Sequence, residues 1–91
     1  MYTPSEKVNE QIVNNFTYHS VQGNQAERYE RLRNAARDFA LLIATNTPTS
    51  REQSVAITKL EETMMWANAA IARNEEWDGG VLMSNTMPER A

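Results

Sequence analysis

Apolar residues recur at helical spacing in two long stretches of the chain. Within about residues 24–44, and again after residue 50, the spacings are 3, 4, 3 and 4. Such spacing aligns side chains on one face of an α-helix. The first stripe consists of Tyr29, Leu32, Ala36, Phe39 and Ile43. The second stripe consists of Ile57, Leu60, Met64, Ala67 and Ile71. The pattern therefore predicts two long amphipathic helices.

A short polar segment around Pro48 separates the two stripes. Proline cannot continue a helix, so the first helix should end before it. Ser50 is expected to cap the second long helix, with Gln53 as its capping-box partner. Two matching stripes joined by a short turn predict an antiparallel helical hairpin with arms of roughly 30–36 Å.

A shorter helix is predicted before this hairpin. Thr3 can cap it, Pro4 suits its first position, Glu6 completes a capping box, and it should end near Asn14 or Asn15. Residues 16–23 are then expected to form an ordered connector. The prediction is an all-α protein with one domain, residues 1–78, followed by a flexible C-terminal tail, residues 79–91, in which periodicity is lost.

Composition excludes several classes of protein. The 91 residues include no cysteine and one histidine, so a disulfide scaffold and the usual zinc sites are excluded, and no metal or cofactor is expected. No apolar run is long enough for a membrane span, and no signal-peptide pattern follows Met1, so a soluble protein without a membrane partner is expected. The formal charge of −3 disfavours binding to DNA or RNA polymers.

The positive charge is concentrated in the first long helix, where four arginines lie within ten residues: Arg28, Arg31, Arg33 and Arg37. Most are expected on a solvated face, Arg28 and Arg31 beside neighbouring glutamates. Arg33 falls at the margin of the apolar stripe, where it should be partly desolvated and in need of an anion or a carbonyl.

The last helix carries a second face, formed by Val55, Trp66, Ala69, Ala70 and Arg73. A large aromatic, small residues and an arginine together favour a self-association interface. The alternative is a second core stripe covered by the N-terminal helix.

Catalysis finds little support in the sequence. The adjacent carboxylates Glu61-Glu62 and Glu75-Glu76 point about 100° apart on a helix, so they are expected to be solvated surface. A different chemistry is indicated at one end of the hairpin, where Arg73 should lie close to the connector with Tyr18 and His19. An aromatic ring and a guanidinium can hold a flat anionic ligand, although aromatic connectors can also simply pack.

Four segments carry a resemblance to a known family: Tyr18-His19, Arg28–Arg33, Pro48–Glu52 and Met64–Asn74. Across roughly residues 12–76 the chain resembles the bacteriophage anti-CBASS cyclic-nucleotide sponges, whose helical hairpin is shared with phage anti-Thoeris sponges. The most specific part is the Met-Trp-Ala-Asn-Ala-Ala-Ile-Ala-Arg sequence, residues 65–73.

The resemblance implies a non-enzymatic protein that acts in the cytoplasm of the infected bacterial host. It would sequester cyclic di- or trinucleotide messengers, for example cyclic GMP-AMP or cyclic triadenylate, and so block CBASS effectors. It also implies a compact homohexamer with ligand pockets between protomers. In this resemblance Tyr18 stacks on a base, Arg33 is the mid-helix basic residue and Arg73 contacts phosphate, with His19 as a possible secondary contact.

Three alternatives remain open on the sequence. The chain could be an oligomeric helical adaptor with no nucleotide ligand, in which Tyr18 and Arg73 only pack. It could be a sponge for cyclic ADP-ribose-type signals. An enzyme that degrades the messenger is the weakest alternative, because no plausible nucleophile, base or metal cluster exists in the sequence.

Overall fold

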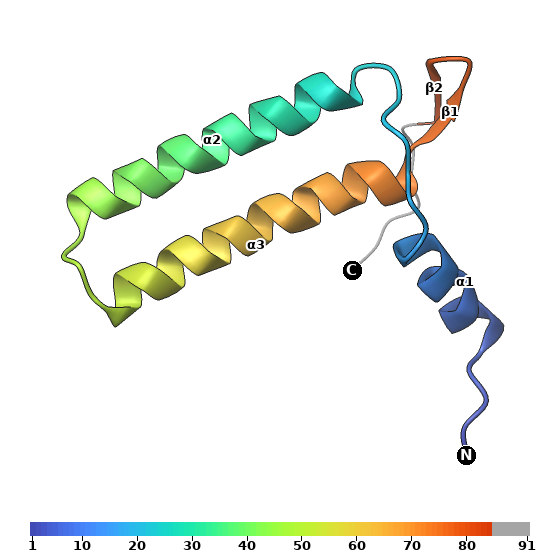
Figure 1. Cartoon of the computed structure of the whole chain (residues 1–91), viewed down its shortest axis with the longest axis horizontal. Helices are drawn as coiled ribbons and strands as arrows, with labels where there is room; N and C mark the ends of the chain where they lie inside the picture. Colours follow the sequence, from blue (N-terminus) through green and yellow to red (C-terminus); the bar gives the residue numbers. More distant parts are fainter. Residues whose placement is uncertain (85–91) are drawn as a thin grey trace.

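The computed structural model describes residues 1–84. The order of elements is α1 (Glu6–Asn15), α2 (Gln25–Asn46), α3 (Arg51–Asn74), β1 (Glu76–Asp78) and β2 (Val81–Ser84). Helices α2 and α3 lie side by side and antiparallel, and α1 points away from them at the end opposite to their turn (Figure 1). The predicted helical hairpin preceded by a short N-terminal helix is thus confirmed.

The helix ends follow local hydrogen bonds. The Ser50 Oγ accepts from the Gln53 N–H at 3.1 Å, as predicted for the start of α3. The Gln53 side chain does not return to Ser50 but donates to the Thr47 carbonyl at 3.0 Å, so it braces the turn between the helices. At α1 the predicted cap is wrong: Ser5, not Thr3, accepts the Val8 N–H at 3.1 Å, and the helix begins at Glu6.

Helix α2 continues to Asn46, two residues past its predicted end. The Asn46 side chain donates to the Leu42 carbonyl at 2.8 Å, and the Thr47 hydroxyl donates to the Ile43 carbonyl at 2.7 Å. These side chains satisfy carbonyls that a helix end otherwise leaves without a partner, which supports the extra half turn.

The all-α expectation is wrong for residues 76–84, which form a two-stranded antiparallel hairpin. Trp77 lies opposite Leu82, and the connecting Gly79 and Gly80 have φ values of 58° and 82°. Two glycines with positive φ suit the tight turn that matches strand twist. The expected boundary between domain and tail falls inside this turn, and the rest of the expected flexible tail lies outside the described residues.

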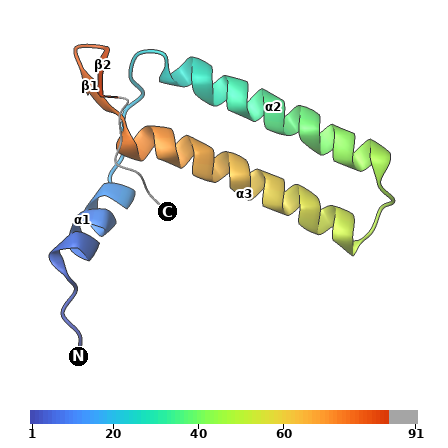
Figure 2. The same cartoon turned by 180° about the vertical axis from the view of Figure 1, so that it is seen from behind.

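The described part of the chain does not enclose an apolar core. No apolar side chain in residues 1–83 is buried, and the one buried residue in that range is Gln25. The Cα radius of gyration is 17.1 Å, whereas a compact chain of this length has a radius of about 12 Å. Viewed from behind, α1 again extends away from the hairpin (Figure 2). None of the described helices has the length and apolar character that crossing a membrane demands.

Candidate ligand-binding site

Two hydrogen bonds fix the connector between α1 and α2, one at its middle and one near α2. His19 Nε2 lies 2.8 Å from the Asn14 carbonyl oxygen, which ties the middle of the connector to the last turn of α1. Near α2, the Gln22 N–H donates to Gln25 Oε1 at 2.9 Å. Gln25 is only 3% exposed. Tyr18, directly before the anchored His19, is 85% exposed and accessible to a ligand.

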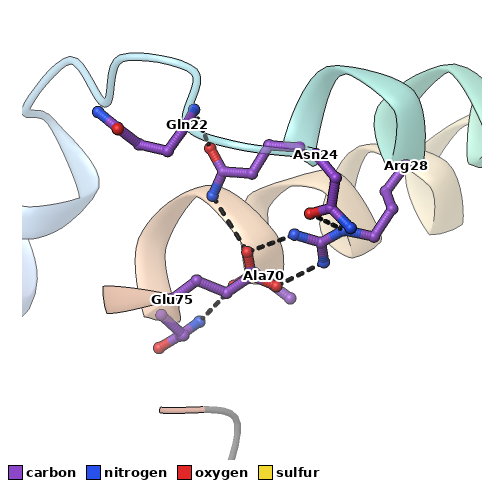
Figure 3. A network of polar contacts seen from close by, with 7 residues as sticks. Gln22, Asn24, Arg28, Ala70 and Glu75 are labelled. Carbon is purple, nitrogen blue, oxygen red and sulfur yellow. Dashed lines mark hydrogen bonds and ion pairs between the residues drawn. The ribbon is translucent and has the colours of Figure 1, made fainter. Parts of the chain in front are cut away.

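A part-buried ion pair joins the start of α2 to the end of α3. Arg28 donates to both carboxylate oxygens of Glu75, with N–O distances of 2.6 and 2.7 Å, and Gln25 Nε2 donates to Glu75 Oε1 at 3.1 Å (Figure 3). Arg28 Nε also donates to Asn24 Oδ1 at 3.0 Å. This geometry is the bidentate form in which arginine binds carboxylates most strongly.

The network sets the charge of its members. Hydrogen bonding from Arg28 lowers the pKa of Glu75 to about 2, against the opposing effect of burial. The bond to Glu75 raises the pKa of Arg28, while burial raises the pKa of the neighbouring Tyr29. The expectation that Glu75 is solvated surface is therefore wrong, since its side chain is 18% exposed. Glu75 is the residue after the last turn of α3, where the sequence gives no sign of a partner at Arg28.

Trp77 attaches the β hairpin to the connector. Gly23 adopts a φ of 48°, and a Cβ at this position would overlap the six-membered ring of Trp77. The close approach requires a residue without a side chain, which explains the glycine at the end of the connector. Helical periodicity could not reveal this contact, because Trp77 lies beyond the last apolar stripe.

These contacts shape a groove of about 260 Å³, here called the Tyr18 groove. It is lined by Tyr18, His19, Ser20, Gln22, Gln25, Ala72, Glu75 and Trp77. The predicted pair Tyr18 and His19 thus share one site. Its remaining wall comes from residues that were not predicted to take part.

A second groove of about 550 Å³, here called the Arg73 groove, lies between α1 and the end of α3. It is lined by Lys7, Glu10, Gln11, Asn14, Asn15, Trp66, Ala69, Ala70, Arg73 and Asn74. The Arg73 Cζ lies 5.8 Å from the Trp66 ring centroid, within cation–π range. Asn14 Nδ2 donates to the Arg73 carbonyl at 3.1 Å and links the two helices.

Helix α1 therefore lies opposite the predicted second face of α3 but does not cover it. Trp66 remains 68% exposed in the Arg73 groove. Lys7 and Arg73 outnumber the single carboxylate of Glu10 among its lining residues, so an anion is favoured there.

Arg33 lies elsewhere, in a third groove of about 210 Å³ along the middle of the hairpin, which we call the Arg33 groove. Its side chain is 56% exposed and pairs loosely with Glu30 at 3.5 Å, so the expected desolvation is not observed. Within one chain, Tyr18, Arg33 and Arg73 consequently line three different grooves. In residues 1–84 no cluster of three or more His, Asp or Glu side chains could hold a metal ion.

Comparison with protein families matches residues 8–72 to the Acb2/Tad1 hairpin domain. The chain belongs to the Acb2/Tad1 hairpin-domain family. This confirms the resemblance drawn from the sequence and makes the chain a member of a family of sponge proteins. Comparisons with curated proteins and with solved structures give no match. The Acb2/Tad1 match includes Tyr18 and Arg33. It begins one residue after Lys7 and ends one residue before Arg73, so both cations of the Arg73 groove lie just outside it.

Proposed function

We propose that this chain binds cyclic di- or trinucleotide messengers and sequesters them without cleavage, so that CBASS effectors in the infected bacterium are not activated. The observation that carries the proposal is the Acb2/Tad1 match over residues 8–72, which covers the connector and nearly all of the helical hairpin. The two grooves at the end of this hairpin supply chemistry that suits such a ligand.

A cyclic dinucleotide carries two negative phosphates and two flat bases. The Arg73 groove offers the guanidinium of Arg73, the ammonium of Lys7 and the ring of Trp66. The Tyr18 groove offers an exposed phenol ring beside polar side chains. Local positive charge in one groove explains how a chain with a net charge of −3 can bind an anion.

We further propose that the protein acts as a homo-oligomer, specifically a hexamer. Tyr18, Arg33 and Arg73 line different grooves in one chain, so a ligand that contacts all three needs residues from more than one copy. Large apolar side chains on all three helices are also exposed, among them Val13, Leu42 and Trp66. A second copy of the chain would cover such surfaces.

The experiment that tests the function is calorimetric titration with cyclic GMP-AMP, cyclic di-GMP and cyclic triadenylate, followed by recovery of the ligand after heat denaturation. Tight binding with intact ligand supports the proposal. Linear nucleotide in the recovered fraction would instead indicate an enzyme. No heat with any of these ligands would overturn the proposal. A separate titration in which only cyclic ADP-ribose binds would identify a different sponge.

Two substitutions test the site residues. Tyr18→Ala and Arg73→Ala should each weaken binding by about 1–3 kcal/mol, because one removes a stacking ring and the other a charged hydrogen-bond donor. Tyr2→Ala and Arg31→Ala are matched controls, since both residues are exposed and line none of the three grooves. Unchanged affinity in both test variants, with the fold intact, would remove Tyr18 and Arg73 from the site.

A further inference from the structure

The β hairpin lies outside the residues that match the Acb2/Tad1 domain, yet it forms part of the Tyr18 groove. The match ends at residue 72, whereas Trp77 in β1 lines the groove together with Tyr18. The groove thus has an aromatic ring from the connector and another from a strand that follows the family domain.

The Trp77 ring is held by a direct contact, and the chain just before it is anchored separately. The ring packs against Gly23, where no Cβ can be accommodated. Two residues before it, Glu75 is bound by both Arg28 and Gln25. The ring is consequently fixed before any ligand arrives, which lowers the entropic cost of binding.

The size and charge of the Tyr18 groove favour a nucleobase over a phosphate. Its volume of about 260 Å³ is below the range of about 300–1,000 Å³ that is typical for a whole drug-sized ligand, so it suits one part of a messenger. No lysine or arginine is among its lining residues, and the charge in it is the Glu75 carboxylate, which Arg28 already pairs. Aromatic rings stack on any base through its π-face.

We propose that Trp77 is a ligand-contacting residue and that the Tyr18 groove holds one base of the cyclic nucleotide, with Trp77 and Tyr18 as its aromatic walls. This inference rests on the proposed function. It adds to the site a residue from outside the family domain and assigns the groove to the base, whereas the phosphates bind where cations are available.

The two tryptophans of the chain allow a direct test, because Trp77 lines the Tyr18 groove and Trp66 lines the Arg73 groove. In Trp66→Phe, the remaining Trp77 should lose fluorescence when a cyclic nucleotide that binds in calorimetry is added. The midpoint should match the Kd that calorimetry gives for the same Trp66→Phe variant. Inorganic phosphate should leave the Trp77 signal unchanged, whereas a phosphate-induced change with no nucleotide response would overturn the assignment to a base.

Affinity measurements supply the second arm. Trp77→Ala should lower affinity by about 5- to 150-fold, and Trp77→Phe, which keeps an aromatic ring, should restore most of it. Val81→Ala is the matched control in the same β hairpin, since Val81 is 62% exposed and does not line the groove. If Trp77 had a purely structural role, Trp77→Ala could weaken binding, but the Trp77 fluorescence of the Trp66→Phe variant would not respond to the nucleotide.

The outcomes separate this inference from the proposed function. Normal binding heat, an unresponsive Trp77 and full affinity in a folded Trp77→Ala variant would overturn the inference and leave the sponge intact. An absence of binding heat with all three cyclic nucleotides would overturn both. Circular dichroism of Trp77→Ala identifies a folding defect. If that variant does not fold, the fluorescence response of Trp66→Phe decides whether Trp77 contacts the ligand.

Discussion

The two grooves at the open end of the helical hairpin are built in different ways. Four segments of the chain form the Tyr18 groove, and they are joined by the Arg28–Glu75 ion pair, the buried Gln25 and the packing of Trp77 on Gly23. The Arg73 groove lies between α1 and α3, which within residues 1–84 share a single hydrogen bond, from Asn14 to the Arg73 carbonyl. Both grooves use the last turn of α3 but different residues of it, Ala72 in the Tyr18 groove and Arg73 and Asn74 in the Arg73 groove.

The difference shows which surfaces the chain completes by itself. The Tyr18 groove is held by contacts within the chain, both polar and apolar, so its shape does not depend on another molecule. The Arg73 groove exposes Trp66 and is bounded by α1, whose Ile12 and Val13 are 48% and 66% exposed. Such a surface gains most from a partner, which agrees with the proposed self-association.

The largest effect is expected from breaking the ion pair that closes the Tyr18 groove. Glu75→Gln should lower the free energy of unfolding by about 2–3 kcal/mol, because Arg28 would remain part-buried without its counter-charge. Thermal unfolding at fixed protein concentration measures the change. Glu62→Gln is the control: its pair with Lys59 at 3.2 Å is exposed and should contribute less than about 0.5 kcal/mol.

Acid should break the same contact without a substitution. The pKa of Glu75 is about 2 in the folded chain and near its ordinary value of 4.5 when unfolded. A lowered folded pKa means that the stabilisation is fully present above about pH 4.5 and is lost as the pH falls toward 2. Unfolding measured between these pH values should show this loss in the wild type and a much smaller one in Glu75→Gln; equal slopes would contradict it.

A smaller effect is expected from displacing Trp77. Gly23→Ala should cost about 2 kcal/mol, since alanine is strained at a φ of 48° and its Cβ overlaps the indole ring. Gly79→Ala isolates the backbone part, because its φ is 58° and no atom lies within 4 Å of the added Cβ. It should cost about 1 kcal/mol. Equal losses in the two variants would show that Trp77 does not pack on Gly23.

The smallest effect is expected at the Arg73 groove. Asn14→Ala removes the hydrogen bond from α1 to α3 and should cost about 1 kcal/mol. The exposed neighbour Asn15 provides the control, and Asn15→Ala should change stability by less than about 0.5 kcal/mol. If Asn14→Ala destabilised the chain more than Glu75→Gln, the ranking of the two grooves would be reversed.

The sequence pointed to some residues of the candidate site but not to the contacts that hold them. Tyr18 and Arg73 could be picked out because each stands at a position that helical geometry places near the end of the hairpin. The position of Arg33 on α2 was predicted, but the ion pairs around it were not. Glu30 pairs with Arg33, and Arg28 pairs with Glu75 at the end of α3. A choice among several nearby partners depends on side-chain positions that spacing does not define.

The helical hairpin could be predicted from local patterns alone, because two apolar stripes with helical spacing, a proline in the turn and Ser50 as a cap leave little alternative for residues 24–74. Those signals are local, and each acts within a turn or two of helix. The pairing of Glu75 with Arg28 and the packing of Trp77 on Gly23 depend on the folded arrangement of the chain, since 47 and 54 residues, respectively, separate these partners. Contacts across such separations depend on how whole helices and strands pack together, so the spacing of neighbouring residues does not predict them.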